Sequence, residues 1–234
     1  MSEGRVLIVV ADDFGQSAGV NRGVVHAHQN GIVTGASLMV RHKAADEAVE
    51  MSRMCPSLSL GLHLDFGEWR LSDGEWVSVY EVPLGEPEAV RWEVERQIAT
   101  FRRLVDRNPT HIDSHQHVHL RASVRSIVEM CAHDLSVPVR RCDPRITYCG
   151  DFYGRDADGS PIPGRISVDG LVGILETLPP GVTELSCHPA MGGDLETMYS
   201  AERVQELEVL CDPRIREAIK RLGITLCSFE EIRS

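Results

Sequence analysis

Seven short apolar segments alternate with amphipathic segments along the 234-residue chain, and this alternation constrains the fold more than any other feature. The apolar segments predict strands, and they lie at residues 6–10, 36–40, 59–64, 110–114, 137–141, 183–187 and 224–228. The amphipathic segments predict helices, and they lie at residues 17–30, 44–54, 88–107, 120–134, 169–178 and 201–222. Repeated β-α units form parallel strands joined by right-handed helical crossovers.

About seven such units predict an α/β fold: a single-domain (β/α) barrel over residues 1–234, distorted, with its active site at the C-terminal ends of the strands. An open doubly wound sheet is the alternative. Neither G-x-G-x-x-G nor a P-loop follows the first strand, which disfavours a nucleotide-binding version of that sheet. Residues 66–90 and 143–166 are rich in Gly, Pro, Asp and Ser, and we expect them to form long loops.

Charge and cysteine content limit the partners and the compartment. The net charge of −11 argues against nucleic acid or an anionic membrane as a partner, since both require clustered Lys and Arg. Glu3 precedes only a very short apolar run, so we expect neither a signal peptide nor a spanning helix there. Seven cysteines without a C-x-x-C pair are typical of a reduced, cytoplasmic protein. A homodimer is left open.

Polar residues fall where four of the predicted strands end. Asp12 and Asp13 end the first strand, and His63, His115 and His188 end the third, fourth and sixth. Because active sites of (β/α) barrels form at the C-terminal ends of their strands, this coincidence predicts one shared site. Taken alone, Asp12 and Asp13 could equally form a turn and a helix N-cap, and His63 or His188 would more often be a buried structural histidine.

The segment THIDSHQHVHL contains five polar residues of the same parity: His111, Asp113, His115, His117 and His119. An extended chain would project all five from one face, but its outer histidines would then lie more than about 25 Å apart. One residue, or two neighbours, can therefore reach a single ion, and the others must orient ligands, contact substrate or lie at the surface.

A carboxylate with two imidazoles leaves positions open for water on Zn²⁺ or another divalent ion. Such an ion lowers the pKa of its water and polarises a carbonyl oxygen. A second carboxylate can then accept the proton of that water, and a histidine can protonate the leaving group. The residues at the strand ends thus predict metal-assisted hydrolysis.

These motifs resemble those of the YdjC-like carbohydrate deacetylase family, which includes the chito-oligosaccharide deacetylases. The matching segments occur in family order over nearly the whole chain: VADDFGQSAGVNRGVVHAHQNGIVTGASLMV, PSLSLGLHLDF, PTHIDSHQHVHL, VPVR, DFYG, ELSCHPA and ITLCSFEEI. The resemblance implies a (β/α) barrel with one divalent ion in the cleft at the strand ends. Zn²⁺ or Mg²⁺ is expected, with Co²⁺ and Ni²⁺ as alternatives. The implied substrate is a small N-acetylated sugar.

The resemblance also implies a role for each matching residue. Asp13, His63 and His115 are the expected metal ligands, Asp12 the general base and His188 the acid. Asp113 is expected to orient a metal ligand or contact the sugar, and substrate binding is expected of Arg140, His119, Phe152 and Tyr153. In the implied reaction, Asp12 deprotonates the metal-bound water as it attacks the acetamide, and His188 protonates the departing amine.

The chain departs from the family pattern after the GLHL motif, where Asp65 begins an acidic and aromatic stretch instead of an Asn-rich one. We expect Asp65 to face away from the ion. Residues 66–108 are short for the family, and we expect this to shorten the loops that shape the sugar cleft. Trp69 and Trp76 are candidates for stacking on sugar rings.

Two other functions stay open: another metal hydrolase on a similar barrel, either an amidohydrolase or a phosphoesterase, and a catalytically inactive carbohydrate-binding relative. A two-metal hydrolase would require further carboxylate or Lys ligands, and an inactive relative should lack Asp12 or His188. Glu202, Glu206 and Glu208 are expected to form the solvated face of a helix.

Overall fold

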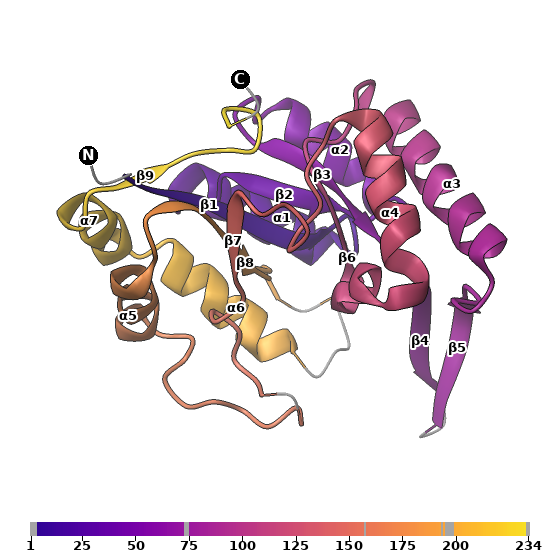
Figure 1. The fold of residues 1–234 in the computed structure, drawn as a ribbon. Coiled ribbons are helices and arrows are strands. Elements are labelled where there is room, and N and C mark those ends of the chain that lie inside the picture. The colour runs from indigo at the N-terminus through magenta and orange to yellow at the C-terminus, as the bar shows by residue number, and fades with distance from the viewer. Residues whose placement is uncertain (1–3, 73–74, 157, 193, 195–198, 233–234) are drawn as a thin grey trace.

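The computed structural model describes residues 4–72, 75–156, 158–192, 194 and 199–232 (Figure 1). Its strands are β1 (Arg5–Phe14), β2 (Gly35–Leu38), β3 (Ser59–Leu64), β4 (Gly67–Ser72), β5 (Glu75–Glu81), β6 (Ile112–Ser114), β7 (Ile146–Cys149), β8 (Gly181–Cys187) and β9 (Ile224–Leu226). Its helices are α1 (Ala18–Asn30), α2 (Ala45–Arg53), α3 (Pro87–Val105), the 3-10 helix η1 (His115–Leu120), α4 (Ala122–Leu135), α5 (Val168–Thr177), α6 (Ser200–Leu210) and α7 (Pro213–Arg221).

Seven parallel strands form one sheet in the order β6-β3-β2-β1-β8-β7, with β9 added beside β1. β1 is at the centre: it pairs with β8 along one edge, and with β9 and then β2 along the other. The sheet curls into a half-barrel, and β6 and β7 are its two edge strands. The predicted α/β fold, a distorted single-domain (β/α) barrel with about seven parallel strands, is confirmed.

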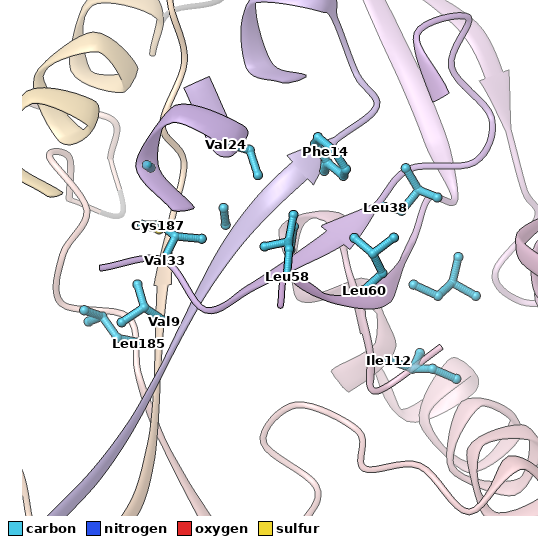
Figure 2. Close-up of a cluster of buried hydrophobic side chains, with 14 of the residues drawn as sticks. Val9, Phe14, Val24, Val33, Leu38, Leu58, Leu60, Ile112, Leu185 and Cys187 are labelled. Carbon is cyan, nitrogen blue, oxygen red and sulfur yellow. The ribbon is translucent and has the colours of Figure 1, made fainter. Parts of the chain in front are cut away.

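Alternation along β1 separates an outer layer from the interior of the barrel. Leu7, Val9 and Ala11 belong to the large core cluster between sheet and helices, part of which is drawn in Figure 2. Ile8 and Val10 point to the other face, into a small cluster with Phe229. Successive strand residues point to opposite faces, so Asp12 lies on the same inner face as Ile8 and Val10. The strand thus delivers Asp12 to the barrel mouth.

The predicted loop at 66–90 contains an antiparallel hairpin, β4 and β5, which extends away from the rest of the chain (Figure 1). The side chains of Trp69 and Trp76 lie outside the described residues, so their predicted sugar contact stays untested. Tyr80 of β5 bonds to Asp65, which also contacts His42. These contacts hold the base of the hairpin against β3.

Two other element predictions were wrong. The segment at 137–141 makes only an isolated bridge, between Val139 and Ile112, and the strand forms at β7 instead, inside a predicted loop. The single helix predicted at 201–222 is divided into α6 and α7, because the side chain of Asp212 caps a new helix whose first residue is Pro213.

The C-terminal segment after β9 enters the barrel. Cys227 donates its backbone N–H to Leu7, and the Phe229 side chain, 1% exposed, packs on Ile8 and Val10. Its apolar ring fills the interior below the strand ends, a layered filling that is usual for small barrels. Among the described residues, no helix is long and apolar enough to cross a membrane.

Candidate active site

The C-terminal ends of β1, β3 and β8 and the start of η1 meet at the mouth of the barrel. They bring together Asp12, Asp13, His63, His115 and His188, the five residues that the sequence analysis placed at strand ends. Asp12, Asp13 and His63 are buried, while the side chain of His115 is 34% exposed. The site therefore combines buried carboxylates with a histidine that solvent can reach.

A backbone irregularity lets both aspartates face this site. Asp13 has φ of 64°, and the pairing of β1 with β2 shifts register between Ala11 and Phe14. Aspartate tolerates this left-handed region better than most residues, and such strain is common at functional sites. Gly15 follows with φ of 93°, and an added Cβ there would lie 3.0 Å from the carbonyl oxygen of Met39. The turn thus needs glycine directly after the two carboxylates.

Asp13, His63 and His115 can each offer one ligand atom, and these atoms lie within 4.8 Å of one another. Asp13 Oδ1 is 3.3 Å from His63 Nε2 and 3.1 Å from His115 Nδ1. His63 Nε2 is buried and makes no hydrogen bond of acceptable geometry with any described residue. The opposite nitrogen, Nδ1, lies 2.7 Å from Asp113 Oδ1. A carboxylate that binds one histidine nitrogen while the other stays free is the usual arrangement around a metal-binding histidine.

Arg203 of α6 binds the other oxygen of Asp13, Oδ2. Burial alone would raise the pKa of Asp13, but the Arg203 guanidinium and the His115 ring hold that pKa well below its usual range. Asp13 is therefore ionised, and its Oδ1 faces the imidazoles of His63 and His115. Sequence reasoning missed Arg203, which lies 190 residues away on a helix whose polar residues suggested a solvated face.

Arg140 is buried, and its guanidinium bonds to three carboxylates. It donates to both oxygens of Asp12 at 2.7 and 2.8 Å, reaches Asp113 Oδ2 at 2.7 Å, and donates from Nε to Glu184 at 2.6 Å. Its side chain has no exposed surface, and its predicted contact with substrate stays a prediction. Arg140 fixes the orientation of Asp12 and Asp113 through charge-assisted hydrogen bonds.

His188 directly follows β8, the strand that pairs with β1, and lies beside Asp12. Its Nε2 is 3.8 Å from Asp12 Oδ2, and its Nδ1 is 3.7 Å from Glu206 Oε1. Glu206 also accepts hydrogen bonds from the His188 backbone and from the Tyr199 hydroxyl. Burial alone would lower the pKa of His188, but Glu206, followed by Asp12, holds it above its ordinary value. Glu206 has no exposed surface, so its assignment to a solvated helix face was wrong; Glu208 is exposed as expected.

Of the other three residues expected to bind substrate, two are buried and one is exposed. His119 is fully buried, with Nδ1 bonded to Ser114 and Nε2 to the Arg140 carbonyl. Phe152 is also fully buried, and sugar contact by either residue stays a prediction. Tyr153 is 37% exposed, and its ring centroid is 5.4 Å from that of His188. Tyr153 therefore remains the expected substrate residue with surface beside the site.

The THIDSHQHVHL segment is extended only as far as Ser114, which is why the predicted parity fails after His115. Gln116 and His117 both have φ of 52°, and the chain coils into η1. His117 turns to the Tyr148 hydroxyl at 3.1 Å. Asp113 lies opposite His63 in the sheet register, where the sequence analysis expected a residue that orients a ligand.

Charge balance around the site favours a bound cation. Among the described residues, four buried carboxylates, those of Asp12, Asp13, Asp113 and Glu206, face two buried guanidiniums, those of Arg140 and Arg203. Burial raises the pKa of a fifth acid, Glu184, to about 7. Uncompensated buried charge is costly, and a divalent cation would offset the excess. The donor set and the free Nε2 of His63 thus fit a divalent metal ion.

The family model of the YdjC-like proteins matches residues 6–221, and the chain belongs to this family. A carbohydrate deacetylase of Geobacillus stearothermophilus is 33% identical, with 97% of this chain and 98% of that protein covered. A chitooligosaccharide deacetylase of Serratia marcescens is 32% identical, with 97% and 99% covered.

Solved structures share the fold at lower sequence identity. A protein of Enterococcus faecalis V583, described as a candidate cellobiose-phosphate cleavage protein, superposes with a TM-score of 0.78 at 24% identity, covering 98% of this chain and 99% of that one. A family 4 carbohydrate esterase of Streptomyces lividans, in complex with acetate, has a TM-score of 0.57 at 15% identity, covering 97% and 93%. Both support the barrel architecture.

Proposed function

We propose that this chain is a metal-dependent hydrolase that removes N-acetyl groups from amino sugars or N-acetylated oligosaccharides. The proposal rests on one observation: the cluster of Asp13, His63 and His115 lies directly beside the pair formed by Asp12 and His188. Two relatives above 30% identity over nearly their full length are named as deacetylases of carbohydrates, which supports the substrate class. The proposal treats residues 1–234 as one deacetylase domain and places it in the cytoplasm, where its seven free cysteines would stay reduced.

The imidazole ligands favour some ions over others. Asp13, His63 and His115 would hold the ion, and two nitrogen donors suit Zn²⁺, Co²⁺ or Ni²⁺ better than Mg²⁺, which prefers oxygen ligands. When bound, such an ion supplies a water of lowered pKa and polarises the acetyl carbonyl.

Asp12 and His188 would move the protons. Asp12, held by two hydrogen bonds from Arg140, accepts a proton from the attacking water. His188, whose pKa Glu206 holds above its ordinary value, donates its proton to the nitrogen as the C–N bond breaks. Water thereby supplies the hydroxyl of the acetate product, and the sugar leaves as a free amine. Tyr153 is placed to contact the sugar beside His188.

The alternatives differ in what they require of the site. A two-metal phosphoesterase or amidohydrolase would need a second ligand set. Asp12, His63 and Asp113 also come within metal-binding distance of one another, but Arg140 occupies oxygens of both carboxylates. An inactive carbohydrate-binding relative would not need the Asp12 and His188 pair. We therefore favour the deacetylase.

Acetate release from a panel of N-acetylated saccharides would test the proposal, with metal-stripped protein restored by Zn²⁺, Co²⁺, Ni²⁺ or Mg²⁺. We expect release with at least one amino-sugar substrate, fastest with Zn²⁺, Co²⁺ or Ni²⁺, and none without added ion. Release from no substrate with any ion would overturn the assignment.

A further inference from the structure

His111 is a buried histidine that the proposed reaction does not use. Its side chain is enclosed in the barrel interior, where it stacks on Phe229 with ring centroids 4.1 Å apart and an interplanar angle of 21°. On the opposite side lies Gly61, where an added Cβ would come within 2.3 Å of the His111 ring. A bare glycine backbone and an aromatic ring from the C-terminal segment thus hold His111 in one place.

The hydrogen bonds of His111 have only one consistent direction. Asp113 Oδ2 lies 2.7 Å from the Arg140 guanidinium and pairs with it as a carboxylate. A carboxylate can only accept, so the single hydroxyl proton of Ser37 goes to Asp113 Oδ2, at 2.7 Å. His111 Nε2, 3.0 Å from Ser37 Oγ, must then carry the proton and donate it. His111 Nδ1 accepts from the Thr110 hydroxyl at 2.9 Å.

This series of hydrogen bonds, from His111 through Ser37 to Asp113, continues to the proposed metal ligands. Asp113 uses Oδ2 for Ser37 and Oδ1 for Nδ1 of His63, at 2.7 Å. Nδ1 of His63 therefore donates to Asp113, and Nε2 is the nitrogen turned toward Asp13. Burial lowers the pKa of His111 to about 4, so this ring is neutral and its single N–H points to Ser37.

We propose that Ser37 and His111, backed by Phe229, form a positioning relay that sets the ring orientation of His63 before a metal ion binds. The inference rests on the proposed function in taking His63 as a metal ligand. Groups one step beyond the ligands commonly change metal affinity by about 10- to 100-fold, because they fix ligand orientation in advance. The relay extends that support from Asp113 to the C-terminal segment of the chain.

Ser37→Ala tests the relay, with Ser59→Ala as its matched control. Both serines are fully buried on neighbouring strands, but the Ser59 hydroxyl has no hydrogen-bond partner among the described residues. Zinc affinity of the metal-stripped protein is measured by competition with a colorimetric chelator. We expect Ser37→Ala to weaken zinc binding by about tenfold and Ser59→Ala by less than twofold. Equal affinities for the two variants would overturn the relay.

His111→Phe is a second test that keeps the stacking on Phe229 and removes both ring nitrogens. His28→Phe is its control, since His28 also bonds through both nitrogens, to Val33 and Ser57, outside the relay. We expect weaker zinc binding for His111→Phe alone. Loss of affinity in both variants, or in neither, would contradict a role for His111.

A spectroscopic readout does not depend on metal or activity. Nitrogen-15 NMR of the histidines in wild-type protein near neutral pH should show His111 as the Nε2–H tautomer, and Ser37→Ala should give a mixture. A wild-type Nδ1–H tautomer would overturn the relay. If the protein binds zinc and shows these differences but releases no acetate, the deacetylase proposal fails and the relay stands. If acetate is released and Ser37→Ala binds zinc normally, the relay fails and the deacetylase proposal stands.

Discussion

The outer and inner faces of the same strands carry very different side chains. On β1, Leu7, Val9 and Ala11 face the helices and join the main apolar core. The inner face passes from Ile8 and Val10 to Asp12 at the barrel mouth, and the neighbouring strands add small or polar residues there: Ser37, Gly61, His63, Asp113 and Glu184.

The contrast shows where stability and chemistry depend on separate contacts. Outer residues contribute through buried apolar area, which is non-directional, so each is supported by many neighbours. Inner charges depend on specific partners: one guanidinium, that of Arg140, binds three carboxylates. A change on the outer face should therefore reduce stability alone, whereas a change on the inner face should alter stability and reaction together.

Arg140→Leu should have the largest effect, because it removes the only described guanidinium that binds Asp12, Asp113 and Glu184. Breaking a buried ion pair from one side costs about 3–5 kcal/mol, so we expect a loss of that order in the free energy of unfolding, with acetate release greatly reduced. Urea unfolding and the acetate assay measure the two. Arg145→Leu, which removes the exposed partner of Asp143, is the control and should change neither.

Asp12→Asn should distinguish the role of the general base from that of the metal ligands. General bases contribute about 10²–10⁴-fold, so acetate release should fall by that factor while zinc binding persists. His63→Ala should lose both zinc and activity, since it removes a ligand. Chelator competition and acetate release on the same preparations distinguish the two variants, and normal turnover of Asp12→Asn would exclude its role as base.

Phe101→Ala tests the outer face. Phe101 of α3 is fully buried in the main core, and truncating a buried phenylalanine costs about 3–5 kcal/mol. We expect a large drop in the free energy of unfolding and unchanged kcat/KM per folded molecule. Trp92→Ala on the same helix, 64% exposed, should have little effect on either quantity. A specific loss of kcat/KM in Phe101→Ala would break the separation of the two faces.

Glu206→Gln should give the smallest effect and appear only in the pH profile. Glu206 holds the pKa of His188 above its ordinary value, and protonated His188 is the proposed acid. Activity is present below that pKa and lost as pH rises through it, so a lowered pKa should move the alkaline limb of kcat/KM to lower pH. Glu208→Gln, on the exposed side of α6, should leave the limb in place.

Much of the fold was predictable because hydrophobic periodicity is local. Strands at 6–10, 59–64 and 183–187 and most helices form where the apolar pattern placed them, and their ends bring the predicted carboxylates and histidines together. The segment at 137–141 looked equally strand-like, yet the sheet pairs with β7 instead. Apolar content alone does not predict which segment will pair with an unpaired edge strand of the sheet.

The sequence by itself determined the alternation of elements and the residues at strand ends, since periodicity and motif spacing are properties of neighbouring residues. Only the tertiary structure decided what those residues touch. Arg203 on Asp13, Glu206 beside His188 and Phe229 on His111 join segments more than a hundred residues apart or on separate elements. Such contacts depend on how helices and the C-terminal segment pack around the barrel, and packing is a property of the whole chain.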